Sequence, residues 1–271
     1  CAIRFMEVND YMYPVRVRVL SSEKEGKNEP DVVTMAPDID WNFTDKEREE
    51  IIDAKMNNRL DDLFRMLFMK QCNLLHEVLP GLFEETEDDT EMLLNISFTN
   101  EDDVIRIGWL YQYYNTEPKN KAFAKKAKIT KEEVPAVTQL FTPDWIVRYM
   151  VENSLGRMWV EGHPDDELKS KWKYYLDEAK QEESVQQELD KIKEEYATLK
   201  PEDIKLIDPC MGSGHILVYA FDVFMQIYEN AGWSQRDAAQ SIIQNNIYGL
   251  DIDDRAAQLS YFAVLMKARQ Y

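Results

Sequence analysis

The sequence predicts an α/β protein in which a mainly helical N-terminal domain precedes a domain built on parallel strands. Two short apolar runs, residues 204–208 and 246–253, carry carboxylates where each run ends. The first run leads into a glycine-rich turn and then into helical spacing from residue 216 to residue 224, which is a strand, loop and helix in sequence. Between residues 44 and 113, by contrast, apolar side chains recur mostly three and four positions apart, which is typical of helices.

The first 70 residues show one strand signal and one strong helix signal. Apolar and basic residues alternate over Val15–Leu20, which predicts an edge strand, and a polar loop follows through residue 40. Thr44 and Glu47 have the spacing of a capping box, in which each residue's side chain accepts from the other's backbone N–H. Apolar residues at helical spacing follow this box and predict the beginning of a helical domain: Ile51, Ile52, Met56, Leu60, Leu63, Phe64, Leu67 and Phe68.

A second helix is predicted from residues 100–103 onward, after an acidic run at residues 84–91 that is expected to be a solvated loop. Helical spacing is expected to turn Ile105, Trp109, Leu110 and Tyr113 inward. The aromatic cluster at residues 109–114 could stack on a nucleic-acid base, but its helical spacing favours packing.

The charge distribution sets one segment apart. The formal net charge is −19, and residues 1–118 and 132–271 contribute −14 and −11, whereas residues 119–131 carry six lysines and no acid. A chain this acidic is expected to bind duplex DNA poorly unless its cations are concentrated. The basic segment could contact phosphates, although an exposed, solvated helix is the favoured interpretation. It is read as the linker that ends a first domain, residues 1–130.

Two helical features are predicted before the glycine-rich turn. Thr142 is expected to cap a helix whose first turn contains Pro143. Residues 164–200 are rich in Lys, Glu and Gln with a narrow apolar stripe, which predicts a helical insertion, either a hairpin or a surface arm. This insertion is interpreted as a docking arm for a partner or as a segment packed on its own domain. The second domain is placed at residues 131–271.

The glycine-rich turn has the composition of a nucleotide-type cofactor site. Asp208 ends the strand, Pro209 stops further pairing, and Gly212 and Gly214 allow a ligand to approach the backbone closely beside free helix amides. The turn lacks the lysine of a phosphate-binding loop and one glycine of the dinucleotide fingerprint, so a sulfonium nucleoside fits it better. An ordinary strand-to-helix turn is the alternative.

The second strand supplies an acid in the expected place. In doubly wound folds a carboxylate at the end of the second strand accepts both ribose hydroxyls, which is the role predicted for Asp251. One of Asp253 and Asp254 is expected to cap the helix spanning residues 255–269.

The composition of the chain bears on disulfides, metal sites and membrane association. The three cysteines are odd in number and widely spaced, and the three histidines are scattered, so neither a disulfide framework nor a metal site is predicted. No apolar run approaches the roughly 20 residues that span a bilayer, so no membrane association and a cytoplasmic location are expected. Because the chain opens on cysteine within a helical pattern, it is expected to be a piece of a longer protein.

These motifs together resemble a known family. The segments TQLFTPDWIVRYMVENSLG, DPCMGSGHI and IYGLDIDDRAAQLSYFAVLMKAR are similar to the opening motifs of S-adenosylmethionine-dependent DNA adenine-N6 methyltransferases of restriction-modification systems, and most similar to the BREX phage-exclusion methyltransferase. The resemblance implies the first part of a Rossmann-like domain, S-adenosylmethionine as cofactor, and double-stranded DNA and other defence-system proteins as partners of the full-length enzyme. The cofactor-binding residues that it implies are Gln139, Phe141, Thr142, Asp208, Pro209, Cys210, Gly212, Ser213, Gly214, His215, Asp251 and Ile252.

No catalytic residue is predicted in this chain. The family holds its flipped adenine in an Asn/Asp-Pro-Pro-Tyr/Phe loop, whereas none of the ten prolines here precedes another proline. The chain alone is therefore expected to be inactive. Two other functions stay open: a nicotinamide-dependent oxidoreductase on a similar fold, and a non-catalytic interaction module.

Overall fold

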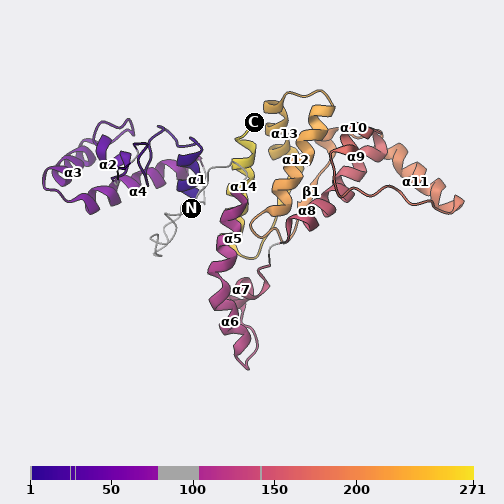
Figure 1. The fold of residues 1–271 in the computed structure, drawn as a ribbon, viewed down its shortest axis with the longest axis horizontal. Coiled ribbons are helices and arrows are strands. Elements are labelled where there is room, and N and C mark those ends of the chain that lie inside the picture. The colour runs from indigo at the N-terminus through magenta and orange to yellow at the C-terminus, as the bar shows by residue number, and fades with distance from the viewer. Residues whose placement is uncertain (1, 25, 28, 79–103, 141) are drawn as a thin grey trace. The chain divides into compact units, whose positions relative to one another are not determined.

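The fold is described from a computed structural model, which covers residues 1–271 except 1, 25, 28, 79–103 and 141. Two units are distinguished, residues 1–107 and 108–271 (Figure 1). Residues 108–130 thus group with the second unit, although the sequence placed them in the first domain; the domain division itself stays a prediction.

The first unit is helical around a small apolar core. Its described helices are α1 (Ala2–Val8), α2 (Asp31–Met35), α3 (Asp45–Met56) and α4 (Leu60–Val78), with α5 (Val104–Tyr114) beginning at its end. The predicted capping box is present at the start of α3, with Thr44 and Glu47 each bonded to the other's backbone. The helical spacing after it is divided between α3 and α4, because Asn58 adopts a left-handed conformation with φ 54°. Fully buried Trp41, Leu63 and Leu67 contribute to the core.

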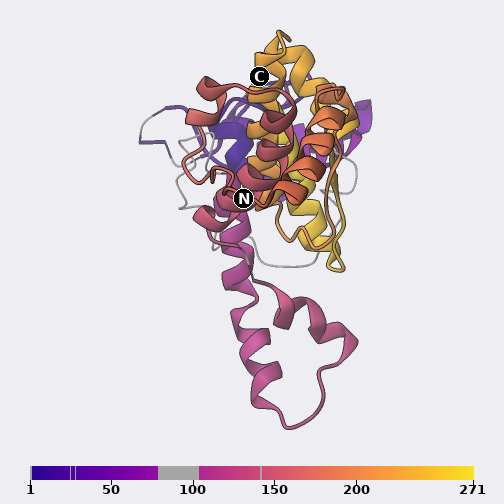
Figure 2. The same cartoon turned by 90° about the vertical axis from the view of Figure 1, so that its right-hand side faces the viewer.

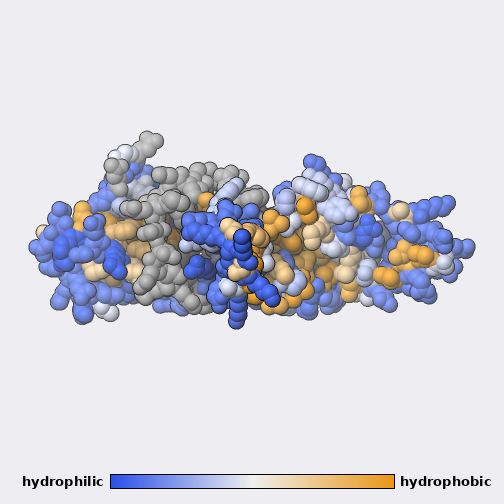
Figure 3. All heavy atoms as spheres, turned by 90° about the horizontal axis from the view of Figure 1, so that it is seen from below, coloured by the Kyte–Doolittle hydropathy of each residue, from blue (hydrophilic) through white to orange (hydrophobic). Residues whose placement is uncertain are grey.

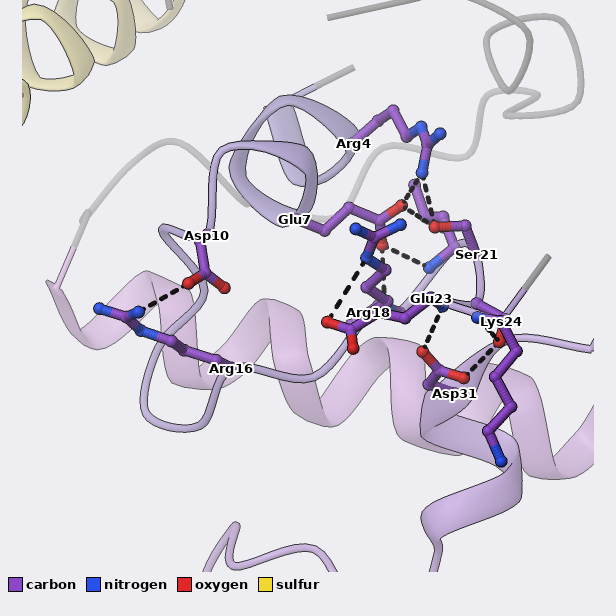
Figure 4. Close-up of polar contacts among 12 residues, drawn as sticks. Arg4, Glu7, Asp10, Arg16, Arg18, Ser21, Glu23, Lys24 and Asp31 are labelled. Carbon is purple, nitrogen blue, oxygen red and sulfur yellow. Dashed lines mark hydrogen bonds and ion pairs between the residues drawn. The ribbon is translucent and has the colours of Figure 1, made fainter. Parts of the chain in front are cut away.

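The strand predicted at Val15–Leu20 is wrong, and the buried carboxylate of Glu7 explains the segment's actual conformation (Figure 4). Glu7 accepts from the backbone N–H groups of Val19 and Leu20, at 2.9 and 2.8 Å. Arg4 and the Ser21 hydroxyl also donate to it. The alternation reflects burial of Val17 and Val19 rather than strand pairing.

The second unit is built around one apolar helix. Strands β1 (Leu206–Asp208) and β2 (Ile247–Gly249) pair in parallel, with Leu206 opposite Ile247 and Asp208 opposite Gly249. Helix α12 (His215–Asn230) contacts both strands and packs against α8 (Asp144–Val151), α13 (Gln235–Ser241) and α14 (Asp254–Ala268), as Figures 1 and 2 show. Phe221, Phe224 and Tyr228 of α12 are fully buried.

Shorter elements complete this unit. They are α6 (Thr116–Ala124), η3 (Lys131–Glu133), α7 (Val134–Thr138), η4 (Glu152–Gly156), α9 (Arg157–Gly162), α10 (Asp166–Ser170), α11 (Glu183–Tyr196), η5 (Pro201–Asp203) and η6 (Ile242–Asn246). The unit is therefore mostly helical around a two-stranded parallel sheet. Among the described helices, none has both the length and the apolar character needed to cross a membrane.

The 164–200 insertion forms an arm rather than a hairpin of two long helices. Only α10 and α11 are helical within it, and the chain from 171 to 182 contains no helix. Trp172 is buried and its indole N–H donates to Gln226 of α12 at 2.8 Å, which anchors the base of the arm. Along α11, Val185 and Ile192 are 44% and 39% exposed, and Figure 3 shows an apolar patch there framed by hydrophilic residues.

Two local predictions in the second unit are wrong. Pro143, not Thr142, occupies the N-cap of α8, and no side chain caps that helix, because the first helical bonds run from Ile146 and Val147 to the Pro143 carbonyl. Tyr113 was expected to face inward from α5, but it is 72% exposed. The α5 residues 104–106 and 109 are described only by their backbone, so the inward packing predicted for Ile105 and Trp109 lies outside the described side chains.

Candidate cofactor site at the carboxyl ends of β1 and β2

The two acidic strand ends meet at the glycine-rich loop. Because β1 and β2 are parallel, both carboxyl ends lie at one edge of the sheet. Asp251 Oδ2 accepts from the Gly212 N–H at 2.8 Å, which joins the end of the second strand to the loop that follows the first. Backbone bonds from Leu250 to Asp208 and from Met211 to Leu250, at 2.9 and 3.0 Å, hold the two chain segments together. The strand, loop and helix predicted from the sequence are confirmed.

Two glycines are required by the shape of this loop. Gly212 and Gly214 have φ of 53° and 87°, the left-handed region that residues with a Cβ rarely adopt. A Cβ on Gly214 would also lie 2.5 Å from the Ser260 hydroxyl of α14. The close passage of α14 leaves the first turn of α12 without a side-chain cap, with Gly214 at its N-cap. Such a helix start presents backbone N–H groups that have no partner within the helix.

The electrostatics favour a positively charged ligand group near Asp208. This carboxyl is buried, at 9% exposure, and it accepts one hydrogen bond from the Cys210 N–H at 3.0 Å. Burial raises the pKa of Asp208, and the neighbouring Asp251 carboxylate raises it further. A cation bound beside the pair would offset both effects, because it stabilises the ionised form.

The other loop residues differ in accessibility. Pro209 and Cys210 are exposed, and Ile252 is 68% exposed beside Asp251. Ser213 and His215 are buried, and among the described residues the Ser213 hydroxyl has no hydrogen-bond partner. An exposed apolar Ile252 next to an acidic strand end is suited to contact a flat ring, while a buried hydroxyl without a partner suits a polar ligand atom.

The described residues of the upstream motif are connected to the loop through helix packing. Gln139 is buried, and neither its amide oxygen nor its amide nitrogen has a hydrogen-bond partner among the described residues. Thr142 is half-buried, and Phe141 lies outside the described residues. Both described residues lie between α7 and α8, and α8 packs against α12. The structure thus joins Asp208, Gly212 and Asp251 directly, whereas it ties Gln139 and Thr142 to them through α8.

Helix α5 was missed as part of this site. A Cβ on Gly108 would lie 2.1 Å from the Ser213 hydroxyl, so the helix passes directly over the loop. Three residues along, the Tyr111 hydroxyl donates to Asp253 at 2.8 Å. The Asp253 N–H in turn donates to Asp251 Oδ1, also at 2.8 Å. The one sequence signal was a glycine inside a helical pattern, which usually has a packing reason.

Asp253 caps α14, as predicted for one of the two acids there, by accepting from the Arg255 N–H at 3.1 Å. The second oxygen of the Asp253 carboxylate accepts the hydrogen bond from the Tyr111 hydroxyl. Burial raises the pKa of Tyr111, and the hydrogen bond to Asp253 raises it further, so this phenol stays protonated and keeps donating at neutral pH. Within the described part of the chain, no group of three or more His, Cys, Asp or Glu side chains could hold a metal ion.

A glycine loop between parallel strands, with acids at both strand ends, is typical of α/β folds that bind a nucleotide-type cofactor. No family model matches the chain. Comparison with curated proteins shows that the chain is homologous, over nearly its whole length, to one segment of the adenine-specific methyltransferases. This finding confirms the resemblance that the motifs indicated.

The relatives are much longer than this chain. The adenine-specific methyltransferase PglX of Lacticaseibacillus casei is 46% identical over 99% of this chain and 24% of its own length. The adenine-specific methyltransferase BrxX of Escherichia coli is 42% identical over all of this chain and 23% of its own length. A putative type II restriction enzyme and methyltransferase of Methanocaldococcus jannaschii is 31% identical over 44% of this chain and 11% of its own length. The chain spans about a quarter of the first two.

Proposed function

We propose that this chain is the S-adenosylmethionine-binding part of a DNA adenine-N6 methyltransferase with a Rossmann-like domain. The observation that carries the proposal is the direct bond between Asp251 and the Gly212 N–H, which assembles the two acidic strand ends and the glycine loop into one site. The homology to adenine-specific methyltransferases supports the choice of cofactor. A restriction-modification or phage-defence role, DNA as the substrate of the whole protein and a cytoplasmic location follow from the same homology as proposals.

The residues present fit this cofactor. Asp251, held in place by two backbone N–H groups, would accept the ribose hydroxyls, and exposed Ile252 would contact the adenine ring. Asp208 would lie near the positively charged methionine end. The backbone of residues 209–215 would line the cradle, and the unpartnered amide of Gln139, with Phe141 and Thr142, would complete the methionine side. When bound, the cofactor supplies an electrophilic methyl group; the residues of this chain bind and orient it.

Removal of the Asp251 carboxylate should weaken cofactor binding. Asp251→Ala deletes charge-assisted hydrogen bonds to the ribose, so we expect a loss of about 1.5 to 3 kcal/mol in binding of S-adenosylmethionine, measured by calorimetry. Asp254→Ala is the matched control. Asp254 lies three residues after Asp251, at an exposed position at the start of α14, and its substitution removes the same charge. Equal affinity in the two variants, with the fold intact by circular dichroism, would remove Asp251 from the site.

Asp208 should show opposite effects on stability and binding. Its raised pKa means that the ionised form is disfavoured in the folded state, so ionised Asp208 opposes folding in full above the raised pKa. This penalty declines as pH falls below the raised pKa, and it is absent below the ordinary pKa. Asp208→Asn removes the penalty at neutral pH and keeps an oxygen for the Cys210 N–H. We expect an unchanged or higher Tm together with weaker binding of S-adenosylmethionine. A Tm lowered by several degrees would contradict this account.

The cofactor also separates the two competing functions. A nicotinamide-dependent oxidoreductase would be stabilised against heat by NAD and not by S-adenosylmethionine, while a non-catalytic module would respond to neither. We expect stabilisation by S-adenosylmethionine alone in a thermal-shift experiment with both ligands at equal concentration.

A further inference from the structure

The basic segment of the sequence forms a defined hairpin in the second unit. Helix α6 runs down to the turn at residues 125–130, and η3 and α7 return alongside it, as Figures 1 and 2 show. Lys125 and Glu133 form an ion pair across the turn. At the open end, Lys119 donates to the Gln139 carbonyl at 3.3 Å, and Ala122 is buried between the two limbs. These contacts hold the two limbs of the hairpin together, with the turn between them.

Its charge is opposite to that of the rest of the chain. Over the whole hairpin, residues 116–138, there are six lysines and three acids, whereas the remainder of the chain carries 26 basic and 48 acidic side chains. Lys121 and Lys125 are neutralised by Glu117 and Glu133. Lys126, Lys128 and Lys131 are exposed at the turn, and none of them forms an ion pair with a described residue. These three lysines lie within six residues of each other. Because they have no ion-pair partner in the described part of the chain, they can bind a polyanion without the loss of an ion pair within the fold.

Exposed aromatic rings accompany these cations. Phe123 on α6 is 63% exposed, and Tyr113 and Tyr114 at the end of α5, directly before α6, are 72% and 58% exposed. Rings as open as these offer a flat apolar face to a bound molecule. Cations interleaved with exposed rings are the composition of surfaces that follow a nucleic-acid backbone.

We propose that the α6–α7 hairpin is a contact surface for duplex DNA, with Lys126, Lys128 and Lys131 meeting backbone phosphates. The proposal rests on the proposed methyltransferase function for the choice of DNA. The hairpin would contribute affinity and position without reading sequence, since phosphate contacts are the same for every base pair. In a chain with a net charge of −19, a localised cationic surface is the place where contact with DNA phosphates is most favourable.

The test compares two triple variants of the whole chain that change net charge equally. One replaces the turn lysines, as Lys126→Gln, Lys128→Gln and Lys131→Gln, and the other replaces exposed lysines of the insertion, as Lys171→Gln, Lys173→Gln and Lys180→Gln. Fluorescence anisotropy with a labelled 30-base-pair duplex, titrated over a range of low salt concentrations, gives both affinity and its salt dependence.

We expect the turn variant to lose about tenfold or more in affinity and about 2.7 from the slope of log K against log salt, at about 0.9 for each lost phosphate contact. The insertion variant should match the unchanged chain. Equal losses in the two variants, absence of DNA binding by the unchanged chain at the lowest salt, or tighter turn-dependent binding to vesicles containing phosphatidylserine would each overturn the proposal. Calorimetry with S-adenosylmethionine on both variants tests the cofactor site separately, because these lysines lie outside it.

Discussion

Asn246→Ala is expected to lower the free energy of unfolding by about 3 to 4 kcal/mol. Asn246 is fully buried where η6 passes into β2, and its amide nitrogen donates to the carbonyls of Pro201 and Ile204, both at 2.7 Å. Its amide oxygen accepts from the Tyr228 hydroxyl at 2.8 Å. Alanine would leave two buried carbonyls without this donor, and each such loss costs about 1 to 3 kcal/mol. Asn246 therefore holds the segment that precedes β1 against the start of β2.

Urea denaturation measures this change, with Gln244→Ala as the control. Gln244 lies two residues earlier in the same η6 turn but is exposed, so its truncation should alter stability by less than about 0.5 kcal/mol. A loss of less than 1 kcal/mol in Asn246→Ala would show that other groups or water satisfy the two carbonyls. Because Asp208 ends β1 and Asp251 follows β2, we expect weaker cofactor binding in the same variant.

The part of the site that could be predicted is the part whose signals are local. Residues 206–215 specify strand, turn and helix through their own backbone preferences: a short apolar run, then glycines at the positions with positive φ. The capping box at Thr44 and the cap at Asp253 are also local signals, because the bonded groups are two or three residues apart. Parallel pairing then follows, since the intervening helix α12 returns the chain to the same sheet edge.

The errors occurred where a distant residue decides the outcome. Val15–Leu20 alternates like a strand, but its N–H groups are taken by Glu7, twelve and thirteen residues earlier in the chain. Alternation reports which side chains are buried and not what the backbone pairs with. The aromatic cluster of α5 shows the converse: its helical spacing predicted packing, and yet Tyr113 and Tyr114 face solvent.

The contribution of α5 to the candidate cofactor site could not be read from the sequence. Tyr111 and Asp253 are 142 residues apart, and no periodicity relates them. Once the helix lies over the loop, one line of hydrogen bonds runs from Tyr111 to Asp253, and from the Asp253 backbone to Asp251. The acid proposed to hold the ribose is thus oriented by a helix that the motif pattern assigns to another domain.

The largest effect that we expect is the absence of methyl transfer to DNA by this chain alone, even with the cofactor bound. The adenine amine is a weak nucleophile and must be held in line with the methyl group, and such positioning accounts for roughly 7 to 11 kcal/mol of a barrier. The site that we propose for the donor lies at Asp208, Gly212 and Asp251, whereas the sequence contains no Pro-Pro loop to hold the acceptor.

Transfer of labelled methyl groups to mixed-sequence DNA at low salt measures this, with the full-length Escherichia coli relative assayed in parallel. We expect the chain to remain at the level of a blank without enzyme, while calorimetry on the same sample detects binding of S-adenosylmethionine. Methylation above the blank would mean that the acceptor is held by residues of this chain. The exposed rings of Tyr113 and Tyr114 at the end of α5 would then have to be tested as the base-stacking surface.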